Sequence, residues 1–181
     1  EHTRLNTLYN LTAGNVSGAR MDLETYVQRY YLERVLYATN RRFQEMSAGQ
    51  FELRMYDLKK AGEGKNRGLD LMVYSTVTGK EREVRTLSGG ESFKAALSLA
   101  LGLSEQVQSS CGGIKIDTMF IDEGFGSLDS ESLEQAVRAL VKVTESGRLL
   151  GIISHVTELK ERIDKQIIVK KQKSGGSTVV I

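Results

Sequence analysis

Strands and helices are expected to alternate along the last third of the chain. The predicted order is a strand at residues 118–121, a helix at 130–144, a strand at 149–153, a helix at 157–163, and final strands at 166–169 and 178–181. Alternation of this kind is typical of a sheet with helices packed against it. The predicted fold class is therefore α/β, and the side chains at the strand ends become candidates for a functional site.

Two helical segments, separated by glycines, come first in the chain. Residues 1–12 have leucines three positions apart, as in the end of a helix. Gly14 and Gly49 mark the ends of the two segments. Residues 21–47 carry apolar side chains at four-residue spacing, which predicts one long amphipathic helix, with Leu23, Val27, Tyr31 and Val35 on its apolar stripe.

Two alternating segments and an apolar helix lie in the middle of the chain. Residues 51–55 and 69–73 alternate apolar with polar side chains, which predicts two β-strands joined by a polar hairpin loop at 59–68. Residues 92–107 are rich in alanine and leucine. We expect them to form a nearly apolar helix that is well buried.

The composition is that of a globular protein. The 181 residues are enough for one domain with a hydrophobic core, and the formal net charge of +2 is too small to indicate nucleic acid by itself. Cys111 is the only cysteine, which excludes an internal disulfide and favours a reducing, cytoplasmic location. No apolar run approaches the roughly 20 residues that span a bilayer, so no membrane segment is expected.

A pair of adjacent glycines stands just before the apolar helix, in the run Ser88-Gly89-Gly90-Glu91. Glycines let backbone N–H groups converge on a ligand without a Cβ in the way. The start of the following helix adds unpaired N–H groups and about half a positive charge, an arrangement that suits phosphate oxygens. A Gly-Gly turn in which Ser88 caps the helix explains the same residues.

Two acidic residues end the predicted strand at 118–121. We expect Asp122 and Glu123 to lie at the carboxyl edge of a buried parallel strand, where α/β sheets bind their ligands. Asp122 can hold Mg²⁺, and Glu123 can act as a general base on an attacking water. A strand that simply ends in solvent-exposed acids is the alternative.

Two further motifs gain weight from their positions. Residues 126–129 (Gly-Ser-Leu-Asp) follow the acidic pair and open a helix, so Asp129 or Ser130 is expected to cap it. His155 follows the strand at 149–153. A lone histidine there is more often structural, but two parallel strands would place it beside Glu123 at one edge of the sheet.

In this order, the four motifs resemble the C-terminal half of an ABC ATPase: signature motif, Walker B, D-loop and switch histidine. The run at 92–101 after the signature and Gly-Phe-Gly at 124–126 are similar to the SbcC family, the SMC-like ATPases of SbcCD nucleases. The resemblance covers essentially the whole chain and is strongest over residues 87–155. It implies an ATPase head that serves DNA-end processing in double-strand-break repair.

The resemblance also implies a head that is split along the sequence. In this family an N-terminal lobe carries the P-loop, a long coiled coil follows, and a C-terminal lobe completes the head. The pattern G-x-x-x-x-G-K-[ST] does not occur in this sequence, which begins at Glu1 and looks like part of a longer protein. Residues 1–48 are then the end of a coiled coil with a long helix, and 49–181 the C-terminal lobe.

Residue roles follow from the same resemblance. Asp122 would help to hold Mg²⁺, Glu123 would position the hydrolytic water, and His155 would contact the γ-phosphate region of ATP. Two heads would form each composite site. The residues that would act across the interface, on ATP held by the opposite head, are Ser88, Gly89, Gly90 and Glu91 of the signature and Asp129 of the D-loop.

The implied partners are the N-terminal P-loop lobe, a second head, the nuclease subunit SbcD, and double-stranded DNA bound through its phosphates. Local basic groups are candidates for DNA contact, although solvated surface charge is the more ordinary explanation: Arg41, Arg42, Lys59, Lys60, Lys65, Arg67, Lys170, Lys171 and Lys173. Another SMC-like ATPase, of RecN or chromosome-condensation type, is one alternative. A non-catalytic coiled-coil module is another, and the acidic pair argues against it.

Overall fold

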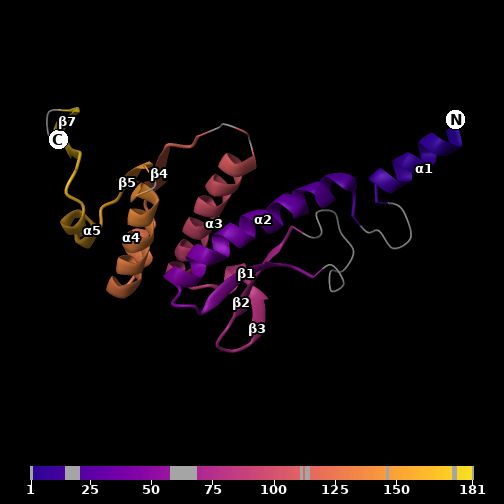
Figure 1. Cartoon of the computed structure of the whole chain (residues 1–181). Helices are drawn as coiled ribbons and strands as arrows, with labels where there is room; N and C mark the ends of the chain where they lie inside the picture. The colour runs from indigo at the N-terminus through magenta and orange to yellow at the C-terminus, as the bar shows by residue number, and fades with distance from the viewer. Residues whose placement is uncertain are drawn as a thin grey trace.

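The computed structural model describes residues 2–14, 21–57, 69–110, 112, 115–145, 147–172 and 175–180. Helices and strands follow one another in an elongated arrangement, with α1 at one end and β7 at the other (Figure 1). The elements are α1 (His2–Thr12), α2 (Leu23–Met46), β1 (Phe51–Met55), β2 (Leu71–Ser75), β3 (Lys80–Glu83), η1 (Val84–Thr86), α3 (Gly89–Ser110), β4 (Thr118–Asp122), η2 (Phe125–Ser127), α4 (Ser130–Glu145), β5 (Leu149–Ile153), α5 (Thr157–Arg162), β6 (Ile168–Lys171) and β7 (Ser177–Val180). The predicted α/β class is confirmed.

Helices α2 and α3 pack against each other at the centre of the molecule (Figure 1). They come closest where Gly102 of α3 meets Thr39 of α2: a Cβ on Gly102 would lie 2.3 Å from the Thr39 Oγ1 and 2.8 Å from its backbone nitrogen. Thr39 is fully buried, and its hydroxyl donates to the carbonyl oxygen of Val35 at 2.8 Å. Glycine at position 102 therefore allows the two helices to approach this closely.

A three-stranded antiparallel sheet, in the order β1-β2-β3, packs beside the first half of α3. The side-chain amide of Asn40, from α2, pairs with both backbone groups of Leu53 in the edge strand β1. Its Oδ1 accepts from the Leu53 nitrogen at 2.8 Å, and its Nδ2 donates to the Leu53 carbonyl at 2.9 Å. One side chain thus satisfies an edge that would otherwise need another strand or water.

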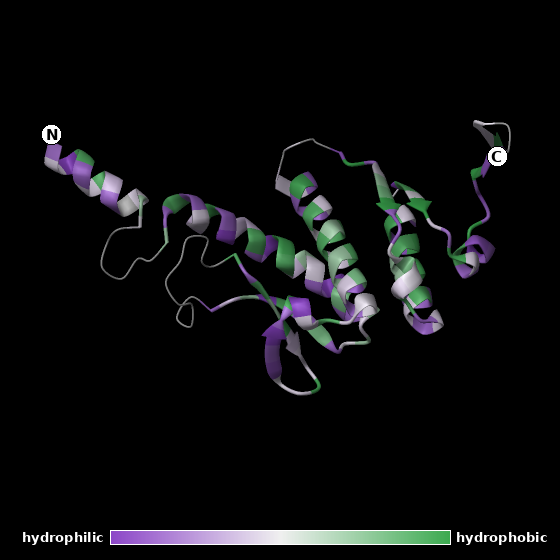
Figure 2. Ribbon diagram, turned by 180° about the vertical axis from the view of Figure 1, so that it is seen from behind, coloured by the Kyte–Doolittle hydropathy of each residue, from purple (hydrophilic) through white to green (hydrophobic). Residues whose placement is uncertain are grey.

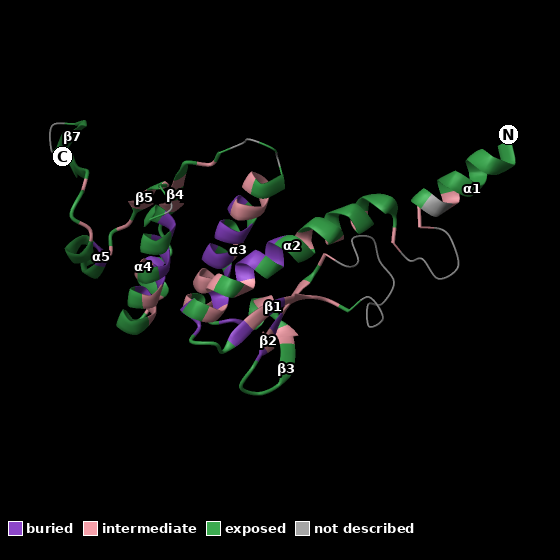
Figure 3. Cartoon of the chain, in the orientation of Figure 1, coloured by how far each residue is buried: buried purple, intermediate pink, exposed green. Residues whose placement is uncertain are grey.

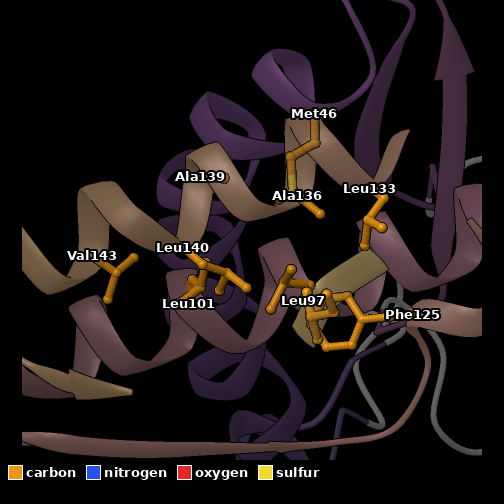
Figure 4. Close-up of a cluster of buried hydrophobic side chains, with 10 residues drawn as sticks. Met46, Leu97, Leu101, Phe125, Leu133, Ala136, Ala139, Leu140 and Val143 are labelled. Atoms are coloured by element: carbon orange, nitrogen blue, oxygen red, sulfur yellow. The ribbon is translucent and has the colours of Figure 1, made fainter. Parts of the chain in front are cut away.

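A second apolar cluster joins α3 to α4 and the parallel strands (Figure 4). Leu97 and Leu101 of α3 lie near Leu140 of α4, and Phe125 of η2 closes the cluster at one end. The buried members are Met46, Leu97, Leu101, Phe125, Leu133, Ala136, Ala139, Leu140, Val143 and Leu159. Helix α3 therefore contributes side chains to the cores on both of its sides.

Strands β4 and β5 form the predicted parallel pair, with Asp122 opposite Ile153. The expectation that β4 is a buried strand is wrong for every second side chain, because only one face of the pair packs on the core. Phe120 is 71% exposed and Leu149 66% exposed on the other face. Figure 2 shows both strands in hydrophobic colours, and Figure 3 shows exposed positions along them.

Three other expectations differ from the structure. Strand β3 is an addition, because its sequence Lys-Glu-Arg-Glu lacks the alternation that marks β1 and β2. Strands β6 and β7 form a separate antiparallel hairpin instead of extending the parallel sheet. Helix α3 is longer than residues 92–107 and is not buried all round, since Leu103 is 52% exposed. The predicted loop at 59–68 and Cys111 lie outside the described residues.

Within the described part of the chain, no helix has the length and apolar character needed to cross a membrane.

Replacing Gly102 with Ala tests the crossing of α2 and α3. The added methyl group would overlap Thr39, and overpacking of this kind costs about 1–3 kcal/mol. We expect Gly102→Ala to lower the free energy of unfolding by that amount in urea denaturation. This outweighs the roughly 1 kcal/mol that alanine normally gains over glycine inside a helix.

Ala96 provides the matched control, because it is an exposed position on the same helix. Ala96→Gly should destabilise the protein by about 1 kcal/mol through helix propensity alone. A Gly102→Ala variant that is as stable as the wild type, or more stable, would contradict the close helix contact.

Candidate functional site

The chain turns sharply at the end of β4. Glu123 has a φ of 58°, in the left-handed region, and Gly124 follows it with a φ of 96°. The Glu123 nitrogen donates to the Ile153 carbonyl of β5 at 2.9 Å, so the turn begins from the paired strands. A non-glycine residue held in this region is uncommon, and such backbone strain clusters at functional sites.

Glu123 and His155 lie side by side at the carboxyl ends of the two strands. The Glu123 Oε2 and the His155 Nδ1 are 2.9 Å apart, and the side chains are 49% and 80% exposed. The sequence order of the motifs predicted this proximity, because parallel strands end at the same edge. A carboxylate and an imidazole in contact, both open to solvent, can receive a ligand and orient a water.

Asp122, the last residue of β4, is also exposed at this edge. Among the described residues, no three His, Cys, Asp or Glu side chains gather into a metal site. Mg²⁺ usually takes only one or two protein carboxylates and fills its other positions with water and substrate phosphates. A single carboxylate at the strand end therefore fits Mg²⁺ that arrives with a nucleotide, and does not fit a metal held by protein ligands alone.

The start of α3 is closed by a reciprocal pair of hydrogen bonds. The Ser88 hydroxyl accepts from the Glu91 nitrogen at 3.3 Å, and the Glu91 carboxylate accepts from the Ser88 nitrogen at 2.8 Å. This is a capping box, so the structure bears out the capping alternative for Ser88. Arg82 of β3 joins it, with its guanidinium 3.3 Å from the Glu91 carboxylate. The cap leaves Ser88 exposed.

The pKa of Glu91 reflects this arrangement. Partial burial raises it, but the hydrogen bonds from Ser88 and the charge of Arg82 outweigh burial, and the pKa lies below its ordinary value. The carboxylate therefore stays ionised at neutral pH and holds the backbone of the signature loop. The part played by Arg82 could not be predicted, because a lone arginine in a charged run forms no pattern.

The two signature glycines pack against a segment of the same chain. A Cβ on Gly89 would lie 3.4 Å from the Ser127 Cβ, and a Cβ on Gly90 would lie 3.2 Å from the Ser127 carbonyl oxygen. Ligand approach and a tight turn were the two explanations that the sequence allowed. Packing against residues that precede α4 is a further physical reason for these glycines, and it fixes the signature loop next to the D-loop.

Asp129 caps α4, as its position in the sequence predicted. Its Oδ1 accepts from the Ser132 nitrogen at 2.7 Å. This hydrogen bond, with a smaller effect from the nearby charge of Lys94, keeps the pKa of Asp129 below its ordinary value. The Lys94 ammonium, from α3, also donates to the Ser132 hydroxyl at 3.2 Å and ties the signature helix to α4.

A cleft of about 430 Å³ opens between the start of α3, the start of α4 and the turn after α2. It divides the predicted site residues into two groups. The residues that line it include Ser88, Gly89, Gly90, Glu91 and Asp129. Asp122, Glu123 and His155 do not line this cleft and gather instead at the strand ends.

The basic groups have a more ordinary explanation where they are described. Arg42 and Arg41 of α2 lie 2.6 Å and 4.0 Å from the carboxylate of Glu105, so they pair two helices. Lys170 and Lys171 are exposed on β6. The remaining candidates lie outside the described residues: Lys59, Lys60, Lys65, Arg67 and Lys173.

Comparison with known proteins agrees with this geometry. The family model described as "SbcC/RAD50-like, Walker B motif" matches residues 67–142. The SbcC polypeptide of the nuclease SbcCD from Vibrio cholerae is 46% identical over all of this chain, and that from Lactococcus lactis is 47% identical over 95% of it. The chain spans only 18% and 16% of the length of these two relatives.

Solved structures show the same fold at lower identity. A chain from a study of ATP-driven dimerization and DNA-stimulated activation of SMC ATPases superposes with a TM-score of 0.64 at 18% identity, over 86% of this chain and 88% of that one. The Smc head domain of Pyrococcus yayanosii gives a TM-score of 0.60 at 20% identity, over 82% of this chain and 26% of that one. With its Walker B strand, its α/β lobe and its identity to these relatives, the chain belongs to the SbcC family.

Proposed function

We propose that this chain is the C-terminal lobe of an ATP-hydrolysing head that dimerises on ATP. The observation that carries the proposal is the separation of the site residues into two groups. The cleft group would act on ATP held by the opposite head, and the strand-end group would act on ATP held by the same head. Each lobe would then serve two nucleotides at once.

The strand-end group would carry out the chemistry of hydrolysis. Glu123 would orient a water and accept its proton, and His155, 2.9 Å from that carboxylate, would hold the carboxylate in place and approach the γ-phosphate. Asp122 would hold Mg²⁺, which supplies charge neutralisation at the phosphates. The exposure of all these side chains suits a site that is completed by another part of the protein.

The cleft group would recognise phosphate when two heads close. The glycines leave room at the start of α3, where unpaired N–H groups and the helix dipole favour an anion. The Ser88 hydroxyl accepts one hydrogen bond from its own helix and keeps a proton to donate. Asp129, at the start of α4, would lie at the interface between the heads.

The open face of the parallel pair supports a partner lobe within the same head. Phe120, Leu149 and Ile153 are 71%, 66% and 55% exposed, and burying such side chains is worth about 1.5–3 kcal/mol each. A P-loop lobe from the remainder of a protein as long as the relatives would cover this face. The relatives' name further suggests a nuclease partner, SbcD, in double-strand-break repair, with duplex DNA bound through its phosphates.

The absence of a P-loop from these residues predicts that residues 1–181 alone do not turn over ATP. That loop normally supplies the N–H groups and the lysine that bind the β- and γ-phosphates. Purified chain should show no phosphate release, and adding a P-loop lobe should restore it. Hydrolysis by the isolated chain that disappears in its Glu123→Gln variant would contradict the proposal.

The two acids at the strand end should be separable in a head that includes the P-loop lobe. Glutamine keeps the shape of Glu123 but accepts no proton, so Glu123→Gln should slow hydrolysis by about 10²-fold or more. The ATP-bound dimer should persist, because Mg²⁺ and ATP still bind. Asp122→Asn should weaken Mg²⁺–ATP binding and lose the dimer too.

Paired phosphate-release and sedimentation measurements distinguish these outcomes. Asp117→Asn is the matched control, because Asp117 is exposed just before the opposite end of β4 and should leave both readouts unchanged. Near-normal hydrolysis by Glu123→Gln, or equal dimer loss in both strand-end variants, would show that the division of roles is wrong.

Ser88→Arg should block dimerisation while it leaves ATP binding nearly intact. The bulky cation would fill the space beside Gly89 and Gly90 that an incoming phosphate needs. Ser109→Arg places the same side chain at an exposed position near the far end of α3 and should dimerise normally. An unchanged ATP-dependent dimer fraction in Ser88→Arg would remove the signature assignment.

A further inference from the structure

A phenylalanine on the signature helix lies directly against the turn that carries Glu123. A Cβ built on Gly124 would be 2.4 Å from both Cδ2 and Cε2 of Phe93, so the ring rests on the glycine where any side chain would stand. Phe93 also meets Phe125 edge-on, with ring centroids 4.8 Å apart and an angle of 61° between the rings. Phe125 is 1% exposed, within the apolar cluster beneath the turn.

The turn needs such support. Glu123 and Gly124 are two consecutive residues with positive φ, and the first of them has a side chain. On the strand side, the Glu123 nitrogen is fixed to the Ile153 carbonyl at 2.9 Å. On the other side, the Phe93 ring and the buried Phe125 hold the next two residues, so the Glu123 carboxylate projects from a backbone that is fixed at both ends.

The same helix is anchored around this point. Gly90, in the first turn of α3, packs against the Ser127 carbonyl oxygen, and the Lys94 ammonium donates to the Ser132 hydroxyl at 3.2 Å. Phe93 lies between these two contacts along the helix. The start of α3 and the segment from Glu123 to Ser132 therefore pack as one unit.

We propose that Phe93 is a positioning residue for Glu123. It acts through Gly124, and the inference rests on the role proposed for Glu123 as the base that activates water. A base must stand within hydrogen-bond reach of the water, and small misplacements cost up to about 10²-fold in rate. The helix that offers Ser88 to one nucleotide thereby also sets the geometry of hydrolysis at another.

The first test is Phe93→Ala in the full-length ATPase. We expect kcat to fall about tenfold, while the KM for ATP and the ATP-dependent dimer fraction stay within about twofold of wild type, because Ser88 and its cap are untouched. Leu99→Ala is the matched control: Leu99 is a partly buried apolar residue of the same helix that packs in the other core cluster. It should leave kcat unchanged.

The second test is suppression. Gly124→Ala should lower kcat because its methyl group collides with the Phe93 ring. In Phe93→Ala/Gly124→Ala the collision is gone, so the double variant should be faster than Gly124→Ala alone, although strain at a φ of 96° keeps it below wild type. Additive losses in the two variants would overturn the proposed contact.

The outcomes separate this inference from the proposed function. A Phe93→Ala enzyme with normal kcat, beside a Glu123→Gln enzyme that does not hydrolyse ATP, would overturn the role of Phe93 alone. Loss of the dimer or a raised KM in Phe93→Ala would show a general structural role and would also overturn it. Normal hydrolysis by Glu123→Gln would contradict the role of Glu123, and this inference with it.

Discussion

The position of α3 between two apolar cores is the constraint on which the rest of the structure depends. On one side the helix crosses α2 at Gly102, where no side chain separates it from Thr39. On the other side Leu97 and Leu101 fill the cluster shared with α4. Because its middle is fixed in this way, the first turn of α3 can hold a loop with two glycines at a defined place, next to Ser127. The stability of the lobe and the geometry of the signature motif therefore have one origin.

That origin also explains how one lobe can serve two nucleotides. The cleft at the start of α3 and the strand ends at Glu123 and His155 are separate places, yet both are built on the same packed unit. A ligand that meets Ser88 and a ligand that meets Glu123 bind to surfaces of one rigid element. Arg82 extends this unit to the antiparallel sheet, because its guanidinium reaches Glu91 from β3.

Much of this architecture could be predicted from the sequence, because local patterns determine it. The order of strands and helices predicted that Glu123 and His155 would meet, and the acid and hydroxyl at helix starts predicted the caps at Asp129 and Ser88. Contacts between segments carry no such pattern. The contacts of Phe93 with Gly124 and of Gly90 with Ser127 depend on tertiary packing, and so does the burial of β4 on one face only. The charged strand β3 was missed because it lacks alternation.

The central claim is that Ser88 and Glu123 of one chain act on different nucleotides. Mixing two inactive full-length variants, Ser88→Arg and Glu123→Gln, tests it most directly. In a mixed dimer, one composite site would contain both substitutions, while the other would combine the intact Glu123 of one head with the intact Ser88 of its partner. ATP hydrolysis by the mixture should therefore rise clearly above that of either variant alone. If both residues acted on the same nucleotide, every site would be defective, and a mixture that stays inactive at all ratios would contradict the account.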